Sequence, residues 1–432
     1  MSILNTIIFS SLLLLLLLTP LPYATVETWS VTVWEIWIFA TVLLWGILTA
    51  IEGRLMLSRN VLALPLLALL LTALLQLLPL AGGGERPSLS YDRTTTLQAA
   101  VRLLALIFFF VLFATFVRTD KRRMLVVTAI ISLAFMIALI GIGQSYITRL
   151  FWQRGAYGPF VNRNHFAGFL EMSIGLTAGL LAGRGIRREQ IAIYLSMLIV
   201  QIVGLVVSAS RGGIISFVAQ AVFLALIIRP EREGEAQPRS SGLARGAAIT
   251  TLLALTLAGI MLLAGPEELL QNFSRLSLKT GTEVGVVESV PLSDQFRRRD
   301  IWQATVQMIK DHPVLGVGLG AYPLSYTRYD PSSGLMRVEQ AHNDYLQIVA
   351  DTGLIGGLMT LVFVVLLFRR GLSATHTRDR RHRAIVAGAL TGCFAIVVHS
   401  FVDFNLQITA NAQLFLALTV LATTPRSAEK EA

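Results

Sequence analysis

The sequence predicts an all-α protein: a polytopic bundle of about 12 transmembrane helices, with one large outer loop that contains short helices. Hydrophobic residues make up 54% of the 432 residues and charged residues only 14%. The mean hydropathy is +0.66, which is far from the composition of a soluble domain. Apolar runs recur along almost the whole chain, and a single long polar stretch interrupts them. These observations indicate a membrane protein.

Apolar runs of about 17 to 25 residues are long enough to cross a bilayer of about 30 Å as helices. The sequence holds twelve such runs, at 3–19, 31–51, 61–80, 99–117, 124–145, 166–182, 191–208, 213–228, 247–264, 349–368, 384–400 and 408–423. The first run resembles a secretory signal, but it lacks a basic segment before it and eleven further runs follow. We therefore expect it to be retained as a helix.

The distribution of Lys and Arg predicts the orientation of these helices. If the N-terminus is inside, the inner connections and the tail hold 21 basic residues, and the opposite short connections hold 6. Both termini are therefore expected inside. The net charge of +10 then reflects topology and contact with anionic membrane lipids, and nucleic acid is not an expected partner. The single cysteine, Cys393, lies within an apolar run.

The chain divides into four parts by this pattern. They are N-terminal transmembrane helices at 1–157, central transmembrane helices with outer-face motifs at 158–264, a large outer loop at 265–348, and C-terminal transmembrane helices with a tail at 349–432. Inside the loop, Ile301, Thr305 and Met308 recur at helical spacing, and His312 followed by Pro313 should end that helix. The glycine-rich "GVGLG" that follows lacks the Lys-Ser/Thr of a phosphate loop, and we expect a turn.

Four polar elements fall on the predicted outer face. They are "GPFVNRNHFAGFLEM" (158–172), "SASRGG" (208–213), "FRRRDIW" (296–302) and "AHNDYLQ" (341–347). Each lies at the outer end of an apolar run or within the outer loop. Segments that are far apart in the chain could therefore contribute to one site on this face.

Arginines are the first candidates for such a site. Arg211 lies between two apolar runs, where a cation is costly unless it snorkels to lipid headgroups or meets an anion. The flanking Gly212 and Gly213 would let a ligand approach closely. The triplet 297–299 is, by itself, typical of a solvated charge run. Beside Arg211 it offers the bidentate donors that suit a phosphate or diphosphate.

His342 is the second candidate. A lone histidine is more often structural, but this one precedes Tyr345, Gly353 and Gly356 at helical spacing, so that small residues would allow tight packing beneath it. A rigidly held imidazole at the membrane rim suits a general base. The polar residues of 162–165 could bind sugar hydroxyls or cap a helix. The carboxylates are scattered along the chain, so no metal site is implied.

Together these motifs resemble the bacterial O-antigen ligase and O-antigen polymerase superfamily, which are multispanning glycosyltransferases of the inner membrane. "HNDYLQIVADTGLIG" fits the pattern H-N-x9-G-x-x-G, and "RRDIW" places an arginine four positions before an apolar residue. "SASRGG" and "GPFVNRNHFAGFL" precede them in the expected order. The resemblance covers about 158–368. It departs from the family at Trp302, where leucine is common, and the spacing from Trp302 selects Arg298, with Arg299 next.

The resemblance implies a glycan donor on undecaprenyl diphosphate, an acceptor that is lipid A core or another lipid-linked glycan, and no cofactor or metal. The site would face the periplasm. It implies His342 as the catalytic base and Arg211, Arg298 and Arg299 as the donor diphosphate site. The substrate-binding or orienting residues would be Asn162, Asn164, His165, Asn343 and Tyr345, the last two to orient His342 or to contact sugar.

Two readings from other classes compete with a glycosyltransferase. A transporter or flippase of anions or lipid-linked sugars would carry ionisable groups inside its spans, and often two similar halves. Glu35 and Arg102 are the main candidates inside spans, and no halves match. A structural assembly factor would leave the arginines and His342 without a shared task. Whether the acceptor makes this a ligase or a polymerase stays open.

Overall fold

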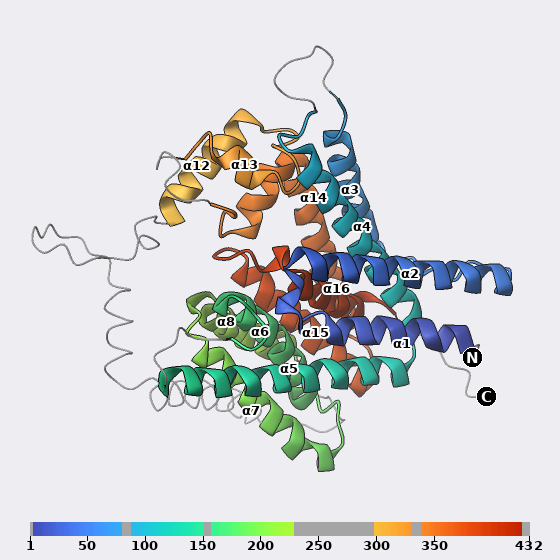
Figure 1. The fold of residues 1–432 in the computed structure, drawn as a ribbon. Helices are drawn as coiled ribbons and strands as arrows, with labels where there is room; N and C mark the ends of the chain where they lie inside the picture. The colour runs from blue at the N-terminus through green and yellow to red at the C-terminus, as the bar shows by residue number, and fades with distance from the viewer. Residues whose placement is uncertain (1–2, 80–87, 151–156, 229–297, 331–337, 426–432) are drawn as a thin grey trace, which may run out of the picture.

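The computed structural model describes residues 3–79, 88–150, 157–228, 298–330 and 338–425, and within these ranges the chain is helical with no β-strand (Figure 1). The helices are α1 (Ile3–Leu18), η1 (Tyr23–Thr25), α2 (Thr28–Glu52), α3 (Ala63–Gln76), α4 (Arg93–Phe116), α5 (Asp120–Leu150), α6 (Arg163–Ala182), η2 (Arg188–Gln190), α7 (Ile191–Val207), α8 (Arg211–Ile227), α12 (Arg298–Asp311), α13 (Tyr322–Tyr326), α14 (Asp344–Ala374), α15 (Arg380–His399), η3 (Asn405–Gln407) and α16 (Thr409–Thr423). The predicted all-α class is confirmed.

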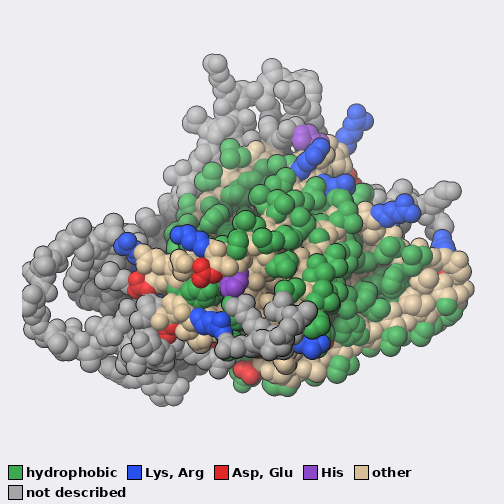
Figure 2. Space-filling model, turned by 90° about the horizontal axis from the view of Figure 1, so that it is seen from above, with side chains coloured by type: hydrophobic (Ala, Val, Ile, Leu, Met, Phe, Trp, Pro, Cys, Tyr) green, Lys and Arg blue, Asp and Glu red, His purple; other side chains and the backbone are tan. Residues whose placement is uncertain are grey.

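Eleven of the twelve predicted runs coincide with a helix, and the run at 247–264 lies outside the described residues. Among the described residues, seven helices are long and apolar enough to cross a membrane, and α1, α3, α8 and α16 are shorter apolar helices. Large hydrophobic side chains are exposed on the outside of the bundle, for example Leu43 at 70% and Leu226 at 77%. Hydrophobic side chains also cover a broad area of the face in Figure 2. This is the exterior of a multi-pass membrane protein.

Two helices, α6 and α15, form the centre of the bundle. They are the most buried of the long apolar helices, and their packing is the most extensive between any two elements described. Glycines face each other where they cross, and a Cβ added at Gly175 would lie 2.5 Å from the backbone nitrogen of Gly392. Small residues at such a crossing let two backbones approach closely inside a membrane. Residues on α6 and α15 therefore share one narrow layer of the molecule.

The predicted inner and outer connections separate to different ends of this bundle. At one end, Asn60 Nδ2 donates to the hydroxyl of Thr423 at 3.0 Å, and the buried Arg123 donates to the Thr424 carbonyl at 3.1 Å. At the other end, Gln76 Nε2 donates to the Asp351 carbonyl at 2.8 Å. The first two contacts join connections that are predicted to lie on the same side of the membrane.

The large loop packs on the outer end of α14 and breaks that helix. The helix α12 ends before Pro313 as predicted, and the backbone N–H of Leu354 donates to the Pro313 carbonyl at 2.8 Å. Gly353 has φ 66° and ψ −168°, a conformation that is essentially restricted to glycine. The predicted stripe through Gly353 is therefore not one continuous helix. The "GVGLG" segment is a turn, with positive φ at each of its three glycines.

Candidate active site

A buried carboxylate, Asp403, lies at the centre of a polar cluster at the outer end of the bundle. It occupies the turn between α15 and η3, and its side chain is 1% exposed. One carboxylate oxygen lies 3.8 Å from His165 Nε2 and 3.9 Å from His342 Nδ1. The other lies 3.9 Å from a guanidinium nitrogen of Arg298 and accepts a hydrogen bond from Asn164 Nδ2. Three of the four predicted outer elements therefore converge on this residue.

Backbone hydrogen bonds hold the Asp403 turn against the start of α14. The N–H of Asp344 donates to the carbonyl of Ser400 at 2.9 Å and to that of Asp403 at 3.1 Å. The side chain of Asp344 is buried, and it accepts from the Ser400 hydroxyl at 2.8 Å. Because these contacts join the two segments, the position of Asp403 also sets the position of His342.

His342 is partly exposed and held from several sides. Its side chain is 35% exposed, and its ring meets the edge of the Phe404 ring at 5.0 Å. The preceding residue, Ala341, donates its N–H to Gln347 Oε1 at 2.7 Å and accepts from Trp302 Nε1 at 2.9 Å. Among the described residues, Nδ1 of His342 has no hydrogen-bond partner, and it faces the Asp403 carboxylate at 3.9 Å. The imidazole is thus fixed in place but open to a substrate.

The structure corrects the local conformation predicted for His342. It does not head the helix, because α14 begins at Asp344 and His342 has a left-handed backbone with φ 50°. The reason is the N-cap: Asn343 Oδ1 accepts the N–H groups of Tyr345 and Leu346, both at 3.0 Å. Capping residues have non-helical backbone, so the chain turns just before the helix and presents the histidine.

The side chains of Asn343 and Tyr345 both form hydrogen bonds that hold the start of α14 in place. Asn343 Nδ2 donates to the Phe401 carbonyl at 3.0 Å, and the Tyr345 hydroxyl donates to the Val397 carbonyl at 2.6 Å. Both side chains tie the start of α14 to the end of α15 and the turn that follows. Their polar atoms are occupied within the protein.

The asparagine and histidine motif at the start of α6 both caps the helix and contacts Asp403. Asn162 is the N-cap of α6, and its side chain accepts the N–H of Asn164 at 2.8 Å. Asn164 and His165 face Asp403, and the His165 ring meets the edge of the Phe404 ring at 4.6 Å. Asn162 is thus structural, whereas the other two residues line the cluster.

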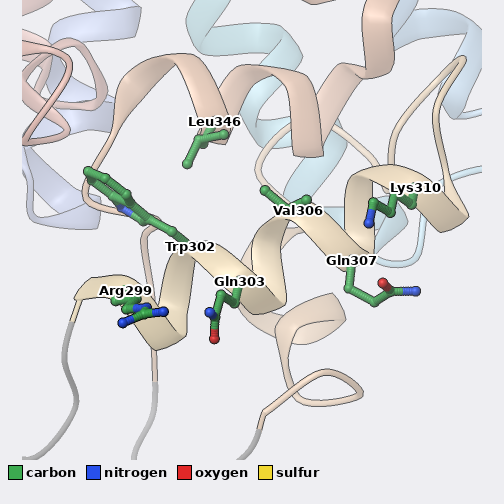
Figure 3. A pocket seen from close by; sticks show the side chains of 7 residues that line it. All are labelled: Arg299, Trp302, Gln303, Val306, Gln307, Lys310 and Leu346. Carbon is green, nitrogen blue, oxygen red and sulfur yellow. The ribbon is translucent and has the colours of Figure 1, made fainter.

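The three candidate arginines occupy different places. Arg298 is half exposed and lies beside Asp403, whereas Arg299, the next residue, lines a groove formed by α12 and α14 (Figure 3). Arg211 is the exposed first residue of α8. A Cβ on its neighbour Gly212 would lie 2.6 Å from His399 Nε2, which places the start of α8 against the end of α15. Arg297 lies outside the described residues.

Two buried residues beneath the cluster were missed by the motifs. Glu171 and His399 are fully buried, and His399 Nδ1 lies 3.0 Å from Glu171 Oε1. A carboxylate inside an apolar helix is costly in a membrane and marks a functional or paired residue. The segment "FLEM" could therefore have indicated Glu171 as a candidate. Asp403 had a weaker signal, a single carboxylate in the short "SFVDFN" connection.

The charges around Asp403 keep it ionised. Burial raises the pKa of this carboxyl, but the His342 ring, His165 and the Phe404 N–H outweigh burial and lower the pKa to about 2. The cluster thus combines a fixed negative charge, two imidazoles and a half-exposed guanidinium. Within the described part of the chain, no group of three or more His, Cys, Asp or Glu side chains is arranged to hold a metal ion.

The comparison with known families covers the middle of the chain. Residues 196–361 match the O-antigen ligase family. The resemblance predicted from the sequence is confirmed, and it indicates a ligase activity of the glycosyltransferase type. The O-antigen ligase region contains Arg211, Arg298, Arg299 and His342, whereas His165 and Asp403 lie outside it. No curated protein matches the chain.

Proposed function

We propose that this protein is a membrane glycosyltransferase that moves a glycan from undecaprenyl diphosphate to a sugar hydroxyl at the periplasmic face of the bacterial inner membrane. The observation that carries the proposal is the convergence of Arg298, His342 and Asp403 at one end of the bundle, from three segments distant in the chain. The O-antigen ligase match over 196–361 supports lipid A core as the acceptor, and a second lipid-linked glycan is the acceptor of a polymerase.

The reaction follows from the charges at the site. The acceptor oxygen forms a bond to the anomeric carbon while the bond from that carbon to the diphosphate oxygen breaks, with inversion of configuration. His342 accepts the hydroxyl proton as general base. Undecaprenyl diphosphate leaves with the electron pair, and Arg298 and Arg211 stabilise its negative charge. In this way guanidinium groups supply the positive charge without a metal.

Asp403 supports the base in this scheme. A carboxylate beside an imidazole fixes the ring and stabilises the imidazolium that forms when the proton moves. The distance of 3.9 Å between Asp403 and His342 Nδ1 leaves room for the ring to tighten against the carboxylate when substrate binds, since catalytic hydrogen bonds are often long in free enzymes. Asp403 is therefore a positioning residue, and His342 is the catalytic one.

The proposed orientation places both termini in the cytoplasm. The excess of Lys and Arg in the predicted inner connections supports it. The contacts of Asn60 and Arg123 with the end of α16 are consistent with these connections sharing one side of the membrane.

The test is transfer by purified protein in lipid vesicles. A radiolabelled glycan on undecaprenyl diphosphate is supplied with either lipid A core or a second lipid-linked glycan, with and without EDTA. We expect labelled product with inverted anomeric configuration, unaffected by EDTA. Product on lipid A core identifies a ligase, and product on the lipid-linked glycan identifies a polymerase. Movement of intact donor across the vesicle without any transfer would contradict the proposal in favour of a flippase.

A further inference from the structure

A groove of about 560 Å³ runs between α12 and the first turn of α14, beside the candidate active site (Figure 3). Seven residues line it: Arg299, Trp302, Gln303, Val306, Gln307, Lys310 and Leu346. Six of them belong to α12, and Leu346 belongs to α14. No acidic side chain is among these lining residues.

The residues of α12 form a stripe with a cation at each end. Arg299, Gln303, Val306 and Lys310 are spaced by four, three and four residues, which places them along one face of the helix. Lys310 follows Arg299 by eleven positions, so at 1.5 Å per residue the stripe is about 16 Å long. An extended ligand with negative groups could therefore contact both ends at once.

The middle of the groove combines apolar and amide groups. Trp302, Val306 and Leu346 provide an apolar strip, and Trp302 is held by the bond from its Nε1 to the Ala341 carbonyl. The amide side chains of Gln303 and Gln307 extend from the same helix (Figure 3), and Gln307 Nε2 also donates to the Asp311 carboxylate at 3.2 Å. A rigid aromatic group beside amide donors and acceptors suits a sugar, whose ring has apolar C–H faces and polar hydroxyl edges.

The groove opens next to the proposed base. The hydrogen bond from Trp302 ends on Ala341, and the next residue is His342. The neighbouring Arg298 lies 3.9 Å from Asp403. Successive helical residues point in directions about 100° apart, so the two neighbouring arginines serve different places. Arg298 belongs to the reactive cluster and Arg299 to the groove.

We propose that the α12–α14 groove is the acceptor subsite, and that it binds a saccharide bearing phosphate or carboxylate groups. The inference rests on the proposed function, and it reassigns Arg299 from the donor to the acceptor. The saccharide lies along α12 with its anionic groups on Arg299 and Lys310. Its nucleophilic hydroxyl reaches His342 at the Trp302 end.

The experiment compares the Michaelis constants of acceptor and donor in the vesicle assay, with lipid A core as the acceptor probe. Lys310 and Arg299 are exposed, so Lys310→Gln and Arg299→Gln should fold. Each is expected to raise the acceptor KM about threefold to tenfold, the range for loss of a charged contact at a partly solvated site. The donor KM should stay within twofold of wild type. Lys310→Arg should restore the wild-type acceptor KM.

A matched control and two altered acceptors identify the groups involved. Arg328 is an exposed cation of the same outer region that lies 4.8 Å over the Tyr91 ring, outside the groove, and Arg328→Gln should leave both KM values unchanged. The effect of Lys310→Gln should vanish with dephosphorylated lipid A core if phosphate is bound, or with carboxyl-reduced core if carboxylate is bound.

Two results would overturn the inference. The first is an unchanged acceptor KM in both the Lys310 and the Arg299 variants. The second is a rise in donor KM instead, which would assign the groove to the donor glycan. Either result leaves the proposed function intact as long as His342→Ala abolishes transfer. Retention of transfer by His342→Ala would instead overturn the proposed function itself.

Discussion

The Asp403→Asn substitution gives the most informative change of a single charge, because it removes the carboxylate and keeps the size of the side chain. At 3.9 Å and an effective dielectric constant of about 20, two unit charges interact by about 4 kcal/mol. His342 is 35% exposed, so screening by water reduces this to about 1–2 kcal/mol. If the carboxylate stabilises the imidazolium in the transition state, kcat should fall about fivefold to thirtyfold.

The assay is steady-state transfer in vesicles together with equilibrium binding of the lipid-linked donor. We expect kcat to fall while the donor Kd changes less than twofold, and Asp403→Glu should recover part of the rate. Glu52 offers a control carboxylate, since it pairs with Arg54 at 3.2 Å in a predicted inner connection away from the cluster. A kcat for Asp403→Asn equal to that of Glu52→Gln would refute the role assigned to Asp403.

The Asp403→Asn variant should also differ from the wild-type protein in its stability at low pH. The pKa of Asp403 is lowered from 3.8 to about 2 in the folded protein, so its stabilising contribution is present above pH 3.8 and is lost as the pH falls toward 2. At 1.36 kcal/mol per unit this contribution is about 2 kcal/mol. Thermal unfolding in detergent between pH 2 and 6 should therefore depend less on pH in Asp403→Asn than in the wild-type protein.

Three further predictions concern residues that support the site. Gly353→Ala should lower thermal stability by about 1–3 kcal/mol, since φ is 66° there, and thermal unfolding in detergent measures it. Trp302→Phe removes the hydrogen bond to Ala341, worth about 0.5–1.5 kcal/mol. It should slow transfer severalfold with unchanged donor binding. A transfer rate equal to that of the wild-type protein would contradict this. Glu171→Gln removes the fully buried carboxylate that contacts His399 and should destabilise the protein by about 1–3 kcal/mol. An unfolding midpoint equal to wild type would rule that out.

Much of the architecture could be predicted because the membrane constrains it. A helix that crosses a bilayer needs a continuous apolar run, so the runs ending at Phe116 or Ala182 are visible in the sequence. The clustering of the motifs at one end also follows from counting spans, since each crossing moves the chain to the other side. That count brought Asn164 and His342, which several predicted spans separate, to the same face.

The contacts within the site could not be predicted in this way. Glu171 and His399 pair across α6 and α15, whose close packing depends on glycines that are more than two hundred positions apart in the chain. Asp403 lies in a short turn, where hydrophobic periodicity cannot show which way a side chain points. The division between Arg298 and Arg299 is set by the rotation of α12 about its axis, and a sequence pattern does not fix that rotation to a single residue.

The break in α14 shows a further limit. The spacing of Tyr345 and Gly353 fits a regular helix, yet Gly353 turns the backbone so that the 313–320 segment can donate to the carbonyls of Ala350 and Asp351. A glycine allows this conformation but does not require it. Only the packing of the outer loop against α14 decides which conformation is adopted.

The most direct test of the central claim is to measure transfer and donor binding on the same preparation of His342→Ala. If one imidazole at the outer end of the bundle takes the proton from the acceptor hydroxyl, kcat should fall by about 10² to 10⁴, with the donor Kd within twofold of the wild-type value. Transfer at a rate near that of the wild-type protein would contradict the account.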